Sequence, residues 1–226
     1  MNRDQFSLDV KSLTLDRIRG LLSHSGELIE DDDMAYLFAT GKSELEIRNA
    51  LALYLHRNLD TTQHSLREWK RHDIAIVDFT GEPILIIEGK VWAHSDVVNV
   101  RKLGGNEKSI RSALKSDLKK LIKAKEKYPG VRCYITIILF SIDVTSNSAL
   151  LRAKDIVKYE PLHRQGITKF GSLDRLEEEG RLKLIDLLNL YGDSMFLPMW
   201  RGSYHGMEVR GSVFILEPDF DKIKDL

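Results

Sequence analysis

The chain of 226 residues is poor in cysteine and proline, with one and five respectively, and its formal net charge is zero. Its single cysteine, Cys133, excludes an intrachain disulfide and a zinc site built from cysteines. Because Cys133 lies in an apolar segment, we expect it to be buried rather than to act as a nucleophile. Few prolines and no low-complexity stretch argue against long linkers. No apolar run approaches a membrane span, and the first residues lack the apolar core of a signal peptide. We therefore expect a cytoplasmic protein without a membrane segment.

Two apolar runs, Asp73–Phe79 and Ile84–Lys90, are rich in β-branched residues and flank a Gly/Pro turn. This pattern predicts a buried β-hairpin. Side chains alternate faces along a strand, so Glu88 and Lys90 should share a face. The hairpin turn should also bring Asp73, at the start of the first strand, beside them. Two carboxylates and an ammonium group are thus expected at one end of the hairpin.

These residue types fit a divalent metal site. Mg²⁺ takes hard oxygen ligands, which Asp73, Glu88 and the carbonyl of Gly89 would supply. Lys90 is expected to orient or deprotonate an attacking water, or to stabilise charge on a phosphate. We therefore predict Mg²⁺ as the cofactor, with Mn²⁺ as a substitute.

Asp73 followed, after a gap of fourteen residues, by Glu88-Gly89-Lys90 resembles the PD-(D/E)XK nuclease superfamily, which has the restriction-endonuclease-like fold. The resemblance covers roughly residues 43–140. It implies an α/β fold with an αβββαβ core and a mixed central sheet flanked by helices. It also implies metal-dependent hydrolysis of phosphodiester bonds that leaves 5′-phosphate and 3′-hydroxyl ends. On this resemblance Asp73 and Glu88 match the metal-binding carboxylates and Lys90 the catalytic lysine, while His72 stands where the motif name has proline.

The segment before the hairpin predicts a helix from Ser43 to about Arg57. Ser43 and Glu46 fit a capping box. Glu44 lies at the start of this helix on the side expected to face the sheet. Members of the superfamily often place a glutamate there near the metals, so Glu44 is our candidate for that role and Glu46 the reserve. A first-turn glutamate that only complements the helix dipole is the alternative.

The segment after the hairpin reads as a long loop over 91–108, a helix over Ser109–Lys127 and a buried strand over Val131–Phe140. His94, in the loop, is a candidate proton donor, although a lone exposed histidine is more often inert. The helix carries a basic stripe suited to a phosphate backbone, against the alternative of an ordinary solvated face. Its candidate nucleic-acid contacts are Lys115, Lys119 and Lys123.

Outside the core we expect an N-terminal helical extension over 1–42 and a C-terminal extension over 141–226, packed on the core in one compact domain. Leu13–Ser23 and Ser172–Tyr191 read as helices. The tail predicts a two-stranded ribbon around Gly206 or Gly211. Its Arg201 and Arg210 are candidates for nucleic-acid contact, and a dimer contact is the alternative.

Together these patterns predict a metal-dependent endonuclease that cuts DNA, of restriction or defence type. A homodimer is expected because cutting both strands commonly uses two copies of one site. Two alternatives stay open. One is a catalytically silent nuclease-fold protein that binds nucleic acid or scaffolds a complex. The other is a protein-interaction module, to which the neutral overall charge gives some weight.

Overall fold

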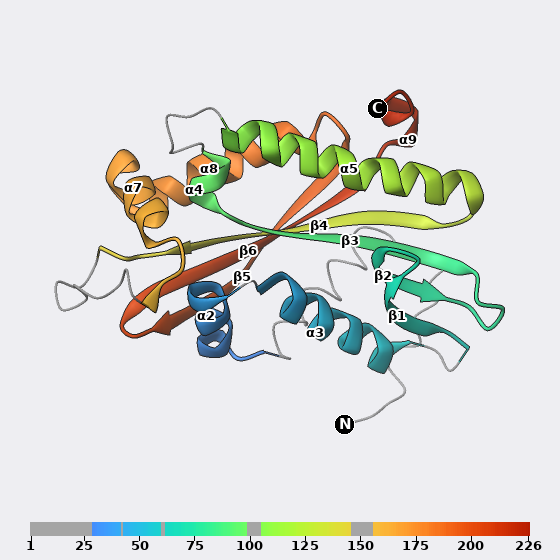
Figure 1. Ribbon diagram of the computed structural model, residues 1–226, viewed down its shortest axis with the longest axis horizontal. Coiled ribbons are helices and arrows are strands. Elements are labelled where there is room, and N and C mark those ends of the chain that lie inside the picture. The colour runs from blue at the N-terminus through green and yellow to red at the C-terminus, as the bar shows by residue number, and fades with distance from the viewer. Residues whose placement is uncertain (1–28, 42, 60–61, 99–104, 146–155) are drawn as a thin grey trace.

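The computed structural model describes residues 29–41, 43–59, 62–98, 105–145 and 156–226, and its described strands form one mixed sheet (Figure 1). The sheet has six strands in the order β1-β2-β3-β4-β6-β5. The strands are β1 (His64–Trp69), β2 (His72–Val77), β3 (Pro83–Ala93), β4 (Arg132–Ile142), β5 (Gly192–Tyr204) and β6 (Met207–Pro218). The helices are α2 (Asp31–Thr40), α3 (Ser43–Asn58), α4 (His94–Val97), α5 (Gly105–Lys127), α7 (Glu160–Phe170), α8 (Leu173–Leu188) and α9 (Phe220–Ile223).

The predicted hairpin is confirmed as β2 and β3, which pair antiparallel with Ile74 opposite Ile87. β3 then pairs in parallel with β4, from Leu85 opposite Arg132 to Ala93 opposite Phe140. Parallel neighbours need a long crossover connection, which α5 provides here. The β1–β2–β3 meander, the crossover helix and β4 therefore follow in the order expected for the core.

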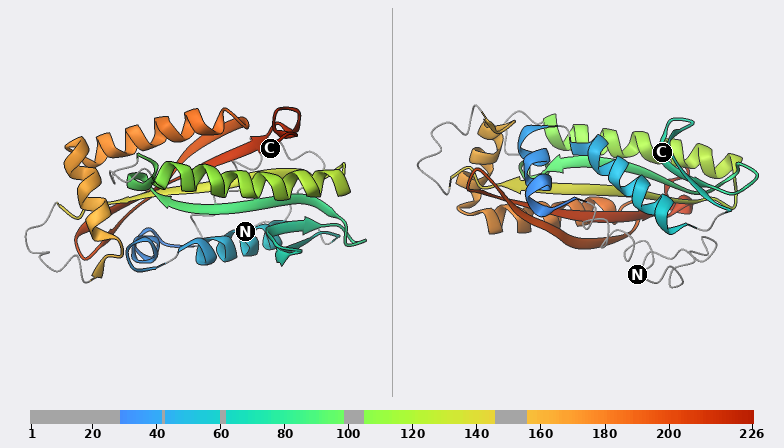
Figure 2. Two further views of the ribbon diagram at one scale, coloured as in Figure 1. Left: turned by 45° about the horizontal axis from the view of Figure 1, so that its top comes forward. Right: turned by 90° about the horizontal axis from the view of Figure 1, so that it is seen from below.

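Helices cover both faces of the sheet (Figure 2). α2 and α3 pack on one face, where Phe38 and Leu51 belong to the same buried cluster as Ile138 of β4. α5 and α8 pack on the other face, where Leu118 and Leu184 join Ile137 in a second cluster. Successive residues of β4 thus feed opposite clusters, which explains why this strand is almost continuously apolar.

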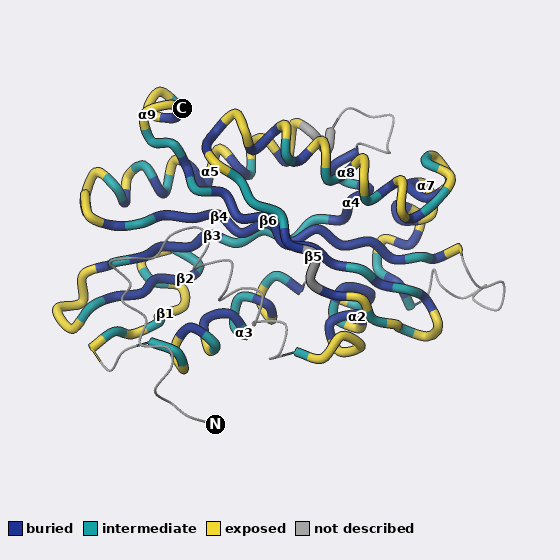
Figure 3. Tube along the Cα trace, turned by 180° about the vertical axis from the view of Figure 1, so that it is seen from behind, coloured by how far each residue is buried: buried dark blue, intermediate teal, exposed yellow. Residues whose placement is uncertain are grey.

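The burial of the central strands is plain in Figure 3, where β3 and β4 are largely dark blue and the outer faces of the helices are exposed. Cys133 is buried in β4, as expected, and burial raises the pKa of its thiol to about 12. A thiol in that state is a poor nucleophile at neutral pH. Among the described residues, no helix is both long and apolar enough to cross a membrane.

The prediction of one long loop over 91–108 is wrong. β3 continues beyond Lys90 to Ala93, because its partner β4 continues alongside as far as Phe140. The short helix α4 follows at once, and α5 begins at Gly105, four residues before the expected start. The described part of this segment is therefore mostly regular structure.

The C-terminal part completes the sheet. The predicted ribbon is confirmed as β5 and β6 around Gly206, and β6 pairs antiparallel with β4. The predicted helix over Ser172–Tyr191 is confirmed as α8, whose N-cap is Ser172. α7 was not foreseen, and the helix expected over 13–23 lies outside the described residues.

Candidate functional site

The start of β2 is joined directly to the Glu88–Lys90 segment. Regular pairing between β2 and β3 ends where Ile74 lies opposite Ile87. Two residues further along β3, the N–H of Gly89 donates to Asp73 Oδ2 at 2.8 Å. A side-chain carboxylate thus replaces a backbone carbonyl at the end of the ladder. The prediction that the hairpin brings Asp73 to the Glu88–Lys90 segment is confirmed, but the carboxylates of Asp73 and Glu88 have different partners.

Glu88 is fully buried at the centre of the sheet, with 0% of its surface exposed. His72 Nδ1 lies 2.6 Å from Glu88 Oε1, and Lys120 Nζ of α5 lies 3.3 Å from Oε2. A buried carboxylate needs such partners because burial strongly disfavours its charge. Glu88 therefore points toward α5 and is held from both sides.

Asp117 of α5 connects the two lysines of the site. Lys90 Nζ lies 2.7 Å from Asp117 Oδ2, and Lys120 Nζ lies 2.8 Å from Oδ1. Lys90 also donates to the carbonyl of Gly89 at 2.9 Å. Asp117 is itself buried, so its position and that of the two ammonium groups are fixed together.

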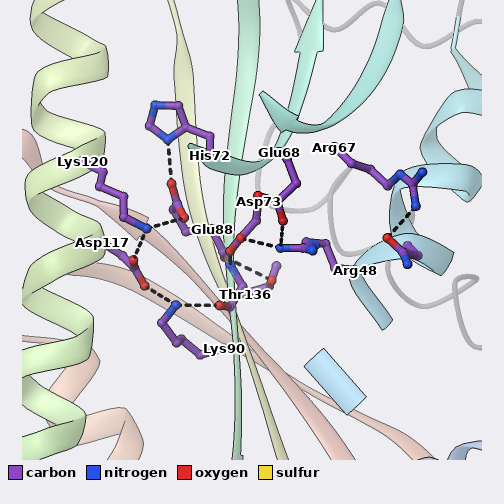
Figure 4. A network of polar contacts seen from close by, with 12 residues as sticks. Arg48, Arg67, Glu68, His72, Asp73, Glu88, Lys90, Asp117, Lys120 and Thr136 are labelled. Atoms are coloured by element: carbon purple, nitrogen blue, oxygen red, sulfur yellow. Dashed lines mark hydrogen bonds and ion pairs between the residues drawn. The ribbon is translucent and has the colours of Figure 1, made fainter. Parts of the chain in front are cut away.

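On the other side of the sheet, Arg48 of α3 binds the second oxygen of Asp73. Arg48 Nη1 lies 2.9 Å from Asp73 Oδ1 and 2.6 Å from Glu68 Oε1. Figure 4 shows the whole arrangement, with Glu88 directed toward His72 and Lys120 while Asp73 is directed toward Arg48. The charged residues thus form one network that crosses the sheet at the start of β2.

Burial and charge shift several protonation equilibria in this network. Burial raises the pKa of Glu88, although the hydrogen bond with His72 and the charge of Lys120 oppose the shift. Burial likewise raises the pKa of Glu44, against the opposing charge of Lys90. For Lys120, burial alone would lower the pKa, but Asp117 and Glu88 together raise it well above its usual value. Lys120 is therefore a permanent cation, whereas the two glutamates take up protons more readily than usual.

Solvent reaches the network from the side of α3. A cavity of about 30 Å³ lies between α3 and the sheet, lined by Glu44, Arg48, Asp73 and Lys90 among others. A wider cleft of about 720 Å³ shares Glu44 and Arg48 with this cavity and continues past Tyr159. Glu44 and Arg48 therefore line both spaces, whereas Asp73 lines only the smaller cavity.

The structure places the other predicted residues unevenly. Glu44 lines the cavity beside Asp73, whereas Glu46, its reserve, is exposed on α3. His94 is not an exposed proton donor: it is buried against Ser141, and burial lowers its pKa to about 4. The remaining candidates lie on α5 and on the ribbon of β5 and β6.

The lysines on α5 and the arginines of the ribbon also differ. Lys115, Lys119 and Lys123 are exposed. Arg201 is exposed and pairs with Glu208 at 2.7 Å. Arg210 pairs with Glu208 and with Asp174 and Glu177 of α8, so its guanidinium ties the ribbon to that helix. The structure does not bring Arg201 or Arg210 to the network around Glu88.

Sequence reasoning missed five members of the network. These are Arg48, Glu68, His72 as a partner of Glu88, Asp117 and Lys120. Asp117 carried one signal: it is an acid among the apolar positions that α5 turns toward the sheet, next to Leu114 and Leu118. The other four are exposed or half-buried polar residues in a chain rich in such residues, and only the fold assigns them to the site.

The residues fit a divalent metal in donor type. Asp73, Glu88 and the carbonyl of Gly89 supply hard oxygens. Each of these groups already contacts a cationic side chain, respectively Arg48, Lys120 and Lys90. Each of these cations has a second carboxylate: Arg48 has Glu68, while Lys90 and Lys120 have Asp117. The oxygens can therefore be released to a metal without leaving a cation unpaired. Within the part of the chain that the structure describes, no three His, Cys, Asp or Glu side chains stand ready grouped for a metal.

Comparison with known proteins found no matching family model, no matching curated protein and no matching solved structure.

Proposed function

We propose that this chain is a metal-dependent endonuclease of the PD-(D/E)XK type that hydrolyses phosphodiester bonds in DNA. The observation that carries the proposal is the hydrogen bond from Gly89 N–H to Asp73 Oδ2, which joins the two halves of the motif at 2.8 Å. The order of α3, β1, β2, β3, α5 and β4, with β3 and β4 parallel, supports it as well. DNA is the substrate because members of this superfamily usually cut DNA.

In this proposal Asp73, Glu88 and the Gly89 carbonyl hold Mg²⁺ or Mn²⁺, with Glu44 at the edge of the site. The metal, when bound, neutralises charge on the phosphate and lowers the pKa of water. Lys90 binds and orients the attacking water. Its ammonium group is held near Gly89 by Asp117, at 2.7 Å, so that the side chain is already ordered before substrate binds.

A cleavage assay tests the proposal. Supercoiled plasmid, phage genomic DNA, single-stranded DNA and structured RNA are incubated with Mg²⁺ or Mn²⁺, and with EDTA as the metal-free control. Asp73→Ala and Lys90→Ala should each abolish cutting, whereas Lys183→Ala, at an exposed position of α8, should leave it unchanged. Metal-dependent cutting that survives both site variants would overturn the assignment, as would cutting of RNA alone.

The second candidate function is a catalytically silent nuclease-fold protein that binds nucleic acid or scaffolds a complex. The observation that favours it is the pairing of every proposed ligand with a protein cation. Metal binding separates the two candidates, because a ligand that binds only the folded state raises the unfolding temperature. Stabilisation by Mn²⁺ that disappears in Glu88→Ala supports the enzyme, and its absence in the wild type supports the silent protein.

A homodimer is part of the proposal, because two copies of one site would cut the two strands. Sedimentation at working concentration tests it. A monomer that still makes double-strand cuts would refute the dimer while leaving the nuclease in place.

A further inference from the structure

The tip of the β1–β2 hairpin holds two basic residues in a backbone conformation that L side chains rarely adopt. Trp69 pairs with His72, so Lys70 and Arg71 form a two-residue turn, and their φ angles are 49° and 76°. Hairpin turns of this kind favour Asn-Gly, because positive φ is strained for residues that carry a Cβ. The chain therefore keeps two long basic side chains where glycine or asparagine would fit the backbone better.

Aromatic contacts fix this tip against the end of α5. Lys70 Nζ lies 4.2 Å from the centre of the Trp69 ring and donates to the hydroxyl of Tyr128 at 3.1 Å. The rings of Trp69 and Tyr128 are themselves 6.0 Å apart, and Lys127 Nζ lies 5.3 Å from the Tyr128 ring. Cation–π contacts of this length are attractive and order side chains that would otherwise move freely. The basic tip is thus preorganised.

The adjoining end of α5 is strongly basic. Residues 119–127 contain five lysines and one acid, Glu126. Lys119, Lys123 and Lys127 are spaced four residues apart, where like charges on a helix repel one another. The helix dipole accounts for cations in the last turn only, and Lys119 and Lys123 precede that turn. Within the described ranges, none of these three lysines forms an ion pair.

We propose that the hairpin tip and this end of α5 form a binding surface for the phosphate backbone of duplex DNA. We call it the hairpin–helix patch, and it consists of Lys70, Arg71, Lys119, Lys123 and Lys127. Lys119 and Lys127 are eight residues apart, or about 12 Å along a helix, which matches roughly three to four phosphates of one strand at ~3.4 Å each. Phosphate contacts of this kind give affinity and orientation without sequence information.

Duplex is favoured over single-stranded DNA because the aromatic rings are already covered. Single strands are held by stacking their bases on free aromatic faces. Trp69 has Lys70 on one side and stacks with His72 at 6.3 Å, and Tyr128 carries both Lys70 and Lys127. The patch therefore offers charge but no open stacking platform.

The patch is continuous with the network at Glu88. Lys70 and Arg71 directly precede His72, and Lys119 and Lys123 flank Lys120; both His72 and Lys120 contact Glu88. DNA held on the patch would therefore lie next to His72 and Lys120, the two residues that contact Glu88. The inference rests on the proposed function only in its choice of DNA, since binding to the patch requires no metal.

The test measures binding without catalysis. Fluorescence anisotropy of a labelled duplex of about 24 base pairs, with EDTA present, gives the association constant at several salt concentrations between about 50 and 200 mM. Each phosphate contact contributes roughly −0.9 to the slope of log K against log salt. The double variants Lys70→Gln/Arg71→Gln and Lys123→Gln/Lys127→Gln should each flatten the slope by about 1.8 and weaken binding at about 0.1 M salt by on the order of fiftyfold.

The matched control is Lys169→Gln/Lys183→Gln, which removes the same charge from exposed positions of α7 and α8 and should leave the slope unchanged. Thermal unfolding of every variant establishes that each is folded. Lys70→Arg, which keeps the charge of the tip, should bind the duplex as tightly as the wild type. An unchanged slope in the patch variants, an equal loss in the control, or tighter binding of single-stranded than of duplex DNA would each overturn the inference. Duplex binding through the patch without any cleavage would refute the proposed nuclease but not the patch.

Discussion

Replacing Asp117 by asparagine tests whether this buried carboxylate is the shared anion of the two lysines in the site. The substitution keeps the shape of the side chain and removes its charge. Breaking a buried ion pair from one side costs about 3–5 kcal/mol, because the remaining charge stays buried without a partner. Here Lys120 keeps 40% and Lys90 19% of its side chain exposed. Each also retains a second acceptor, Glu88 for Lys120 and the Gly89 carbonyl for Lys90. We therefore expect Asp117→Asn to lower the free energy of unfolding by about 2–3 kcal/mol, below the range for a fully buried pair.

Urea and thermal unfolding measure this loss, which for a chain of this size corresponds to a fall in the unfolding temperature of roughly 5–10 °C. Asp186→Asn, at an exposed position of α8, is the matched control and should change stability by less than about 0.5 kcal/mol. A double-mutant cycle with Lys120→Met should give a coupling energy above roughly 1 kcal/mol. Additive effects, or a loss in Asp117→Asn no larger than that of the control, would refute the shared-anion reasoning.

Three further outcomes follow from buried or paired groups. Arg48→Gln should destabilise the metal-free protein by about 2 kcal/mol. It should also enlarge the thermal stabilisation by Mn²⁺, because Asp73 would no longer have to give up Arg48 in order to bind the metal, and a smaller stabilisation would contradict this. Burial lowers the pKa of His163 from 6.5 to about 4, so the neutral ring stabilises the fold above pH 6.5 and that stabilisation is lost as the pH falls toward 4. The loss is about 3 kcal/mol, and His163→Met cannot suffer it. In urea unfolding, the difference in free energy of unfolding between wild type and His163→Met should therefore shrink by about that amount between neutral pH and pH 4, and a pH-independent difference would refute the reasoning. Gly180→Ala would place a Cβ 2.7 Å from His94 Cδ2. This overpacking should outweigh the gain in helix propensity and lower the free energy of unfolding by about 1–2 kcal/mol, whereas the control Glu179→Ala should be nearly neutral.

The elements around the site were predictable because their apolar patterns are strong. β2, β3 and β4 each bury nearly every side chain over several residues, and the turn before Pro83 leaves only a hairpin as the connection. Strand alternation alone predicted that Glu88 and Lys90 share a face, and in the structure both side chains contact residues of α5. Periodicity thus predicted which side chains of one strand lie on the same face.

The partners from distant segments were not predictable in the same way. Arg48 meets Asp73 only because α3 packs across the start of β2, and Lys120 meets Glu88 only because α5 crosses over β3. The extension of β3 to Ala93 was missed for a related reason, because its pairing with β4 outweighs the irregular local pattern after Lys90. His94, read as an exposed loop residue, begins α4 and is buried against Gly180 of α8 and Ser141.

In the proposed metal site, Asp117 should support metal binding without being a ligand. A metal that took Glu88 and the Gly89 carbonyl, as proposed, would leave Lys120 and Lys90 with Asp117, 2.8 and 2.7 Å away. In Asp117→Asn neither lysine has this second anion, so release of the ligands would leave buried positive charge unpaired, beside a divalent cation. Stabilisation by Mn²⁺ should therefore be much smaller in Asp117→Asn than in Asp186→Asn, although all proposed ligands remain. Equal stabilisation in the two variants would mean that the lysines do not exchange partners, and the cations would then be a permanent part of the site, as in a silent protein.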